Sequence, residues 1–408
     1  MKLAMVSGHA SPLTVSGSVE GGGQHVHVAE LASALGRCGH EVIVYVRRAD
    51  REVSSVVDSG QGYRVVHVPA GPARPLASEE LLPFLGEFAA FLAERWVKQP
   101  PDLAHAQFWT SGLATQLAAR RTGTPTVQSF RALDSVPCDP QGNAKTTLGE
   151  RGRIERIIAR NANRVIARST EEFFRLAEQG CPRSRISVIP SGVNVERFTP
   201  EGRCESGTGR RRIVAAGRLV PRKGFTTAIS ALAHLPDSEL IIAGGPDRGA
   251  LPRDQEAQRL RAYAEEHEVA DRVHLLGSVP RERIPALLRS ADAVVCASQY
   301  ESCGMVALEA MACGVPVVAS AAGGLADTVV DRVTGLLVRP SDTAALVHAL
   351  RELFSKPELA KGYGIAGRDR ALARYGWERI AADTARAYAV ALGEVQTDSG
   401  GTPSASPG

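Results

Sequence analysis

Short apolar runs alternate along this chain with segments in which apolar residues recur every three or four positions. The runs at 3–7, 41–46 and 63–68 predict buried strands, whereas the spacing of apolar residues over 28–35 predicts a helix. Strands that alternate with helices are typical of parallel βαβ units. The pattern therefore predicts an α/β protein built on parallel sheets.

The alternation occurs twice, with a break between the two series. Residues 199–210 combine proline, glycine and charge without periodicity, which is linker composition. Two α/β halves joined by a linker imply a ligand-binding cleft between them. The predicted division is an N-terminal domain over 1–198, a linker over 199–210, a C-terminal domain over 211–376, a last helix over 377–392 and a polar, disordered tail over 393–408.

Composition adds mainly exclusions. The 408 residues are 23% charged and 44% hydrophobic, and the net charge of +4 is too small to indicate nucleic acid as the main partner. No apolar run reaches the length of a membrane-spanning helix or of a signal-peptide core. Seven cysteines without a C-x-x-C pair suit reduced thiols. We therefore expect a cytoplasmic protein without a transmembrane segment.

The stretch 293–320 carries the densest candidate chemistry. A predicted strand over 293–297 leads through a polar turn into a predicted helix that starts at Met305. This turn lies at the carboxyl end of a parallel strand, where ligands bind, and the helix start favours an anion. Glu301 lies in the turn, and Glu309 lies on the helix among apolar neighbours. A buried carboxylate needs a partner, although a helix carboxylate that simply reaches water is equally allowed.

Two cations and two glycines occupy similar strand-to-helix junctions. Arg218 follows one predicted strand and Lys223 begins the next helix, a combination that suits a diphosphate, although ordinary surface charge is the alternative for each. Gly22 and Gly23 open the first helix, where phosphate oxygens could approach bare backbone; a flexible loop is the alternative. The first turn lacks G-x-G-x-x-G, which disfavours a dinucleotide site.

Several of these segments resemble the retaining glycosyltransferases of family 4. Glu301 and Glu309 enclose seven residues, as in the E-x7-E motif of that family, and Ser-Gln-Tyr-Glu-Ser-Cys-Gly and Cys-Gly-Val-Pro-Val-Val-Ala-Ser also match. The stretch Asp-Leu-Ala-His-Ala-Gln-Phe-Trp-Thr-Ser-Gly is similar to the family's D-x-x-H-x-H-x-W-x-S-G segment, with Gln107 in place of the second histidine. In detail the chain resembles the branch that contains the D-inositol 3-phosphate glycosyltransferases.

The resemblance implies the GT-B fold, in which two Rossmann-like domains face each other across a deep cleft. The first domain would bind the acceptor, the second would bind the nucleotide-sugar, and the last helix would cross back onto the first. A homodimer is also allowed, and the sequence does not decide the oligomeric state.

The same resemblance assigns roles to single residues. Glu301 would orient the sugar hydroxyls, Glu309 would bind the ribose diol, and His105 would contact the transferred sugar. Arg131, after a predicted strand, is the candidate acceptor contact. Arg218 and Lys223 would hold the diphosphate, and with His105 and Glu301 they form the predicted catalytic set. The donor site would be completed by Gly22, Gly23, Gly277, Val279, Cys303, Gly304, Met305 and Val306, where Cys303 replaces the phenylalanine usual in the family.

The predicted reaction is transfer of GlcNAc or glucose from a nucleotide diphosphosugar, UDP-linked, to a hydroxyl of a small polar acceptor such as a cyclitol, an inositol phosphate or an aminocyclitol. The nucleotide-sugar is a substrate, so we expect no cofactor. The chain contains no Asp-x-Asp triplet, so we also expect no metal requirement. The alternatives are a GDP-mannose-dependent mannosyltransferase that acts on a lipid headgroup and, disfavoured, an NAD-dependent oxidoreductase.

Overall fold

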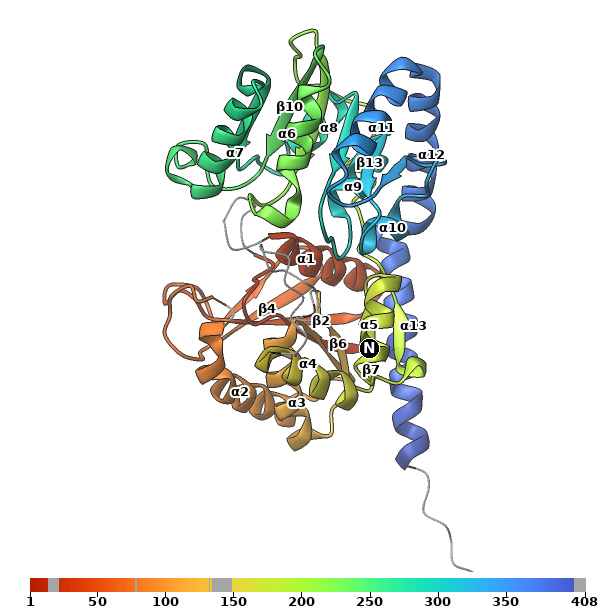
Figure 1. Cartoon of the computed structure of the whole chain (residues 1–408). Coiled ribbons are helices and arrows are strands. Elements are labelled where there is room, and N and C mark those ends of the chain that lie inside the picture. The colour runs from red at the N-terminus through yellow and green to blue at the C-terminus, as the bar shows by residue number, and fades with distance from the viewer. Residues whose placement is uncertain (14–21, 78, 132, 134–148, 400–408) are drawn as a thin grey trace, which may run out of the picture.

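The computed structural model describes residues 1–13, 22–77, 79–131, 133 and 149–399. Within these ranges the chain forms two α/β domains, stacked one above the other in Figure 1, with α13 running from the upper domain down the side of the lower one. The sheets have the strand orders β3-β4-β2-β1-β5-β6-β7-β8 and β11-β10-β9-β12-β13-β14. This architecture confirms the prediction of two parallel-sheet, Rossmann-like domains.

The strands of the two sheets are short and mostly buried, as the apolar runs predicted. In the N-terminal sheet they are β1 (Lys2–Val6), β2 (Glu41–Arg47), β3 (Val56–Asp58), β4 (Tyr63–Val68), β5 (Leu103–Gln107), β6 (Thr126–Ser129), β7 (Arg164–Ala167) and β8 (Ile186–Val188). In the C-terminal sheet they are β9 (Arg211–Ala216), β10 (Ser238–Ala243), β11 (Val273–Gly277), β12 (Ala293–Cys296), β13 (Val317–Ser320) and β14 (Leu336–Val338). Neighbouring strands pair in parallel, apart from the antiparallel pair β3–β4.

Helices cover both faces of each sheet. Those of the N-terminal domain are α1 (Gly22–Arg37), α2 (Leu85–Lys98), α3 (Trp109–Thr122), α4 (Glu150–Asn161) and α5 (Thr170–Glu178). Those that follow are α6 (Phe225–Ala233), α7 (Gln255–Glu266), α8 (Ile284–Arg289), α9 (Met305–Ala312), α10 (Gly324–Thr328), α11 (Thr343–Ser355), α12 (Pro357–Tyr375) and α13 (Trp377–Ser399).

The last helix belongs to the core of the first domain. Trp377, Ile380 and Tyr388 of α13 are buried in one apolar cluster with Leu3 and Val28. Fully burying side chains of this size contributes about 1.5–3 kcal/mol each. This packing fixes the position of a C-terminal segment against the sheet that carries β5 and β6.

The chain crosses between the domains twice, at adjacent points. Ile189 is buried in the N-terminal core, whereas Val193 and Phe198 are already buried in the C-terminal core. The first crossing therefore lies near 190–192, earlier than the linker predicted at 199–210. The Val193 N–H donates to the Tyr375 carbonyl at 2.8 Å, and this bond joins the outgoing segment to the returning one.

Two helical segments have ends that need an explanation. Residues 79–98 form a 3₁₀ segment, Glu79–Phe84, followed by α2, because Pro83 lacks an N–H and its ring crowds the preceding turn. The last helix, expected to end at 392, continues to Ser399, so the first part of the predicted tail is helical. The rest of that tail, 400–408, lies outside the described residues.

Candidate active site

A glycine-ended loop places Lys223 at the carboxyl edge of the C-terminal sheet. After β9 the chain passes through a 3₁₀ turn, Pro221–Lys223, and reverses at Gly224, whose φ is +68°. A Cβ on Gly224 would lie 2.0 Å from the carbonyl oxygen of Ala297 at the end of β12. The Gln299 N–H donates to the Arg222 carbonyl at 2.8 Å. The loop after β9 and the loop after β12 are therefore in direct backbone contact.

This contact brings Lys223 and Glu301 together, as two of the predicted catalytic residues. The Lys223 ammonium forms a short ion pair with the Glu301 carboxylate, and the two side chains are 14% and 16% exposed. Burial raises the pKa of Glu301, but attraction and a hydrogen bond from Lys223 outweigh this effect and leave the pKa below its usual value. Glu301 is thus a fixed carboxylate with one face toward solvent.

Arg218 lies on the same edge of the sheet but, unlike Lys223, it is not part of an ion pair with the described residues. Its side chain is exposed, and within the described ranges it has no ion-pair partner. Arg222, in the 3₁₀ turn between them, donates instead to the Tyr300 carbonyl at 3.4 Å. Of these cations, Arg218 is the one that forms no ion pair with the described residues, as a ligand-binding group requires.

Glycines allow the turn that carries Glu301 to lead into α9 and to pack against the start of α10. Gly304 has a φ of +61° and immediately precedes α9, so the amides of Met305 and Val306 form the first turn of that helix. The Gly324 N–H donates to the Glu301 carbonyl at 2.7 Å, and a Cβ on Gly323 would lie 2.2 Å from the same oxygen. Cys303 is buried beneath this turn. Small residues thus allow two loops to stack at the sheet edge.

Glu309 has a partner that the sequence did not reveal. It is 5% exposed on α9, and its Oε1 lies 2.5 Å from Nη1 of Arg281. Arg281 directly follows the loop with Gly277 and Val279, which were predicted to belong to the donor site, and its guanidinium lies 5.0 Å from the centre of the Phe198 ring. The prediction that a buried Glu309 needs a partner agrees with this pair. The alternative of a carboxylate that reaches water does not.

Residues from the two domains meet around the start of α1. A Cβ on Gly23 would lie 2.9 Å from the sulfur of Met305, so these two predicted donor-site residues are adjacent across the domains. Gly22 begins α1 beside them. The Arg131 guanidinium donates to the Gly23 carbonyl at 3.1 Å. Predicted donor-site residues of the two domains are therefore in contact here.

The start of α5 provides a second contact between the domains. The Gly323 N–H donates to the Glu171 carboxylate at 2.8 Å, and the Thr170 N–H donates to the Asp327 carboxylate at 2.6 Å. Both bonds lie next to the turn that holds Glu301. Neither bond could be predicted from the sequence, because both depend on how the two domains are placed.

His105 is found inside the N-terminal domain. It is 3% exposed, with Nδ1 at 2.7 Å from the Tyr388 hydroxyl and Nε2 at 2.9 Å from the Ser129 hydroxyl. Gln107, which replaces the second histidine of the motif, lies 3.1 Å from the same Nε2. Burial lowers the pKa of His105 to about 3, so the ring is neutral at physiological pH. These bonds join β5 to α13, and the predicted contact with sugar is not visible in this geometry.

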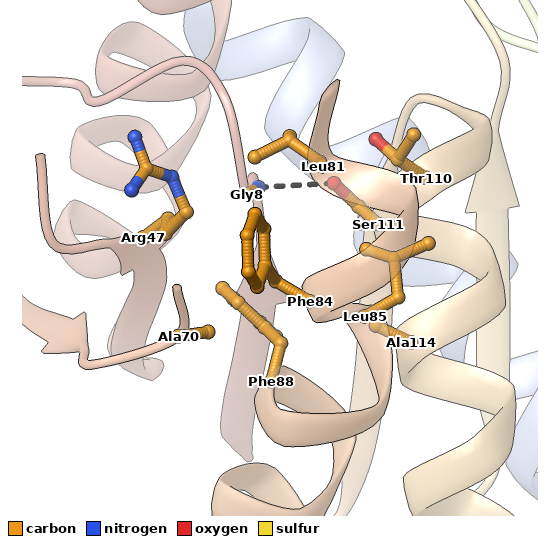
Figure 2. A pocket seen from close by; sticks show the side chains of 10 residues that line it. All are labelled: Gly8, Arg47, Ala70, Leu81, Phe84, Leu85, Phe88, Thr110, Ser111 and Ala114. Carbon is orange, nitrogen blue, oxygen red and sulfur yellow. Dashed lines mark hydrogen bonds between the residues drawn. The ribbon is translucent and has the colours of Figure 1, made fainter. Parts of the chain in front are cut away.

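A pocket at the same edge of the N-terminal sheet has an apolar wall. Figure 2 shows Leu81, Phe84 and Phe88 lining it, with the Ser111 hydroxyl accepting a 3.0 Å hydrogen bond from the Gly8 N–H. Arg47 also borders the pocket, but its guanidinium donates to backbone carbonyls, including Pro72 at 2.6 Å. Ser111 thereby fixes the chain just after β1.

We expect Gly224→Ala to destabilise the protein by about 3 kcal/mol or more, because a Cβ there would strain a left-handed residue and overlap the Ala297 carbonyl. Thermal unfolding should show a lower Tm. Gly362→Ala in α12, where the added Cβ meets nothing within 4 Å, is the matched control and should leave the Tm unchanged or slightly higher. An equal Tm for both variants would contradict the close packing of the two loops.

Among the described residues, no three His, Cys, Asp or Glu side chains are grouped so that they could hold a metal ion. The helices described include none with the length and apolar character needed to cross a membrane.

Comparison with known proteins agrees with this geometry. Residues 22–192 match the family model "Glycosyl transferase 4-like domain" and residues 203–370 match "Glycosyl transferases group 1". A D-inositol 3-phosphate glycosyltransferase of Xylanimonas cellulosilytica is 35% identical, over 96% of this chain and 97% of that protein. Sucrose-phosphate synthase from Thermosynechococcus elongatus has a TM-score of 0.86 and 28% identity, over 98% of this chain and 100% of that one.

Another solved structure shares the fold at lower identity. Anabaena HepE, solved in complex with UDP and glucose, has a TM-score of 0.73 and 20% identity, over 95% of this chain and 99% of that one. The family models together span most of both domains, and the relatives match over nearly their full length. This chain therefore belongs to the family 4 glycosyltransferases of the GT-B fold and is an enzyme similar to the D-inositol 3-phosphate glycosyltransferases.

Proposed function

We propose that this glycosyltransferase moves GlcNAc or glucose from a UDP-sugar to a hydroxyl of a small polar acceptor, with retention of the anomeric configuration. The acceptor would be a cyclitol, an inositol phosphate or an aminocyclitol. The observation that carries the proposal is the close Lys223–Glu301 pair beside the exposed Arg218, at the carboxyl edge of the C-terminal sheet. The names of its relatives support the acceptor class, and the UDP in HepE supports the donor class.

In this proposal the cations act on the leaving group. The bond between the sugar and the β-phosphate breaks, and negative charge grows on phosphate oxygens that Arg218 and Lys223 would stabilise. The amides at the start of α9 would add hydrogen-bond donors, and Glu301 would orient the sugar hydroxyls. The acceptor oxygen bonds to the same face of the anomeric carbon, and its proton passes to the departing phosphate.

His105 would act as a positioning residue under this proposal. It links β5 to Tyr388 of α13 and to Ser129 of β6, and so fixes the floor of the acceptor domain. A neutral, fully hydrogen-bonded ring is not a source of protons at physiological pH. The sugar contact implied by the family resemblance would require the ring to exchange one of these two partners.

Binding and transfer should be measured together. We expect calorimetry to show binding of UDP-GlcNAc or UDP-glucose, weaker binding of GDP-mannose and no binding of NAD. Mass spectrometry should detect transfer to D-myo-inositol 3-phosphate or a related cyclitol. The rate should persist in EDTA, because the side chains assigned to the diphosphate are cations. Activity that is lost in EDTA and restored by Mg²⁺, or a preference for NAD, would contradict the proposal.

A further inference from the structure

Two arginines follow neighbouring strands on the acceptor side of the cleft. β6 and β7 pair in parallel, with Val127 opposite Arg164, so the residues that follow them lie at one sheet edge. Arg131 follows β6 and has a φ of +68°, and Arg168 follows β7 directly. Burial and then the charge of Arg168 lower the pKa of Arg131, in agreement with the placement of both residues at one sheet edge.

The guanidinium of Arg168 is buried without a hydrogen-bond partner in the part of the chain that the structure describes. The residue is 3% exposed, and its Nε, Nη1 and Nη2 are all buried and form no hydrogen bond with the described residues. Nη1 of Arg131 is in the same condition, while the other nitrogen of its fork donates to the Gly23 carbonyl. Buried charges are normally paired, and an unpaired one is strongly unfavourable. Two such groups at one sheet edge form a place that an anion would neutralise.

The nearest carboxylate does not neutralise this pair. One oxygen of Glu172 accepts a hydrogen bond from the backbone N–H of Arg168 at 2.8 Å, and the other has no partner. Burial raises the pKa of Glu172, which weakens it as a counter-ion. The pKa of His27 is lowered by burial and then by the charges of Arg168 and Arg131, so its ring is neutral and does not offset their charge. Positive charge is therefore in excess at this place.

The position of the pair indicates which substrate it faces. Arg131 donates to the carbonyl of Gly23, which lies against the sulfur of Met305. Arg168 lies two residues before Thr170, whose N–H donates to Asp327 beside the turn that holds Glu301. The pair therefore lies across from the proposed sugar site, on the domain opposite Arg218 and Lys223. Guanidinium forks match the oxygens of a phosphate or carboxylate in bidentate geometry.

We propose that Arg131 and Arg168 together bind an anionic group of the acceptor, for which a phosphate is the best chemical match. This assignment of the acceptor rests on the proposed function, whereas the existence of an anion site does not. The competing source of a phosphate is the donor itself, and the experiment has to separate the two.

Inorganic phosphate tests the site directly. Phosphate should raise the Tm of the wild-type protein, both free and with UDP present, by binding the folded state. In Arg168→Gln and Arg131→Gln the apparent phosphate affinity should fall at least about tenfold, because a charged partner is lost. Arg164→Gln, at the other end of β7, is the matched control and should respond as the wild type does. Absence of a response in the wild type, or an equal response in all variants, overturns the site.

Stability without ligand distinguishes a binding arginine from a structural one. Arg168→Gln should unfold at a Tm no lower than the wild type, because it removes a buried charge that has no partner. Arg168→Lys should keep part of the phosphate response, since it retains the charge without the fork. A clear drop in Tm for Arg168→Gln would show that the side chain supports the fold, and would overturn the proposal.

Substrate kinetics decide which molecule carries the phosphate. Arg168→Gln should raise the KM for D-myo-inositol 3-phosphate at least about tenfold and leave the rate with myo-inositol and the Kd of UDP within about threefold. If the UDP affinity falls as much as the phosphate affinity, the anion belongs to the donor and the acceptor assignment is wrong. If the wild type binds phosphate but not UDP, the proposed function fails while the anion site stands.

Discussion

Replacing Lys223 with alanine is expected to lower kcat by about 10²–10³-fold, the usual effect of removing one group that stabilises transition-state charge. Lys223 is held by the Gly224 turn against the Glu301 carboxylate, so it is placed before substrate binds. A single-turnover assay of UDP release, combined with the Kd of UDP, separates the loss in the chemical step from the loss in binding.

Arg222→Ala is the matched control for this variant, because Arg222 lies in the same 3₁₀ turn but donates to the Tyr300 carbonyl. It should retain kcat within about fivefold. Glu301→Gln should also lower kcat strongly, and the double variant Lys223→Ala, Glu301→Gln should lose much less than the product of the two single effects, since contacting residues are coupled. Independent, multiplicative losses would show that the pair does not act as one unit.

Sequence analysis placed those candidate site residues that lie close together in one short stretch of chain. Glu301, Gly304 and Met305 lie in one turn between a strand and a helix, and hydrophobic periodicity is enough to place that turn at the sheet edge. The position of Lys223 could be predicted for the same reason, because Lys223 follows a strand of the same sheet. Sheet order then brought these residues together, because β9 and β12 are neighbours.

The features that sequence analysis missed depend on packing between distant segments. Arg281 is 28 residues before Glu309, and only the fold places the two charges 2.5 Å apart. His105 was predicted to contact the sugar, and one of its partners, Tyr388, comes from a helix 283 residues further along the chain. Arg168 follows a strand, as Arg218 does, so its position at a sheet edge could have been predicted from the sequence. Its lack of a hydrogen-bond partner among the described residues is visible only in the structure.

The second large effect is expected at Glu309. If this carboxylate binds the ribose diol, Glu309→Gln should weaken UDP binding by about 10–100-fold, because hydrogen bonds to a charged group contribute about 1.5–3 kcal/mol. Calorimetry with UDP measures this loss. Glutamine keeps the size of the side chain and can still accept a hydrogen bond from Arg281, so the helix should remain folded.

Deoxy nucleotides separate a ribose contact from a general loss of structure. The wild type should prefer UDP over 2′-deoxy-UDP and 3′-deoxy-UDP, and Glu309→Gln should bind all three with similar affinity, since the group that reads the hydroxyls is gone. Glu352→Gln is the matched control, as Glu352 is a similarly shielded carboxylate that pairs with Lys356 at 3.2 Å on α11. A Glu309 variant that still discriminates like the wild type would restrict this carboxylate to its ion pair with Arg281.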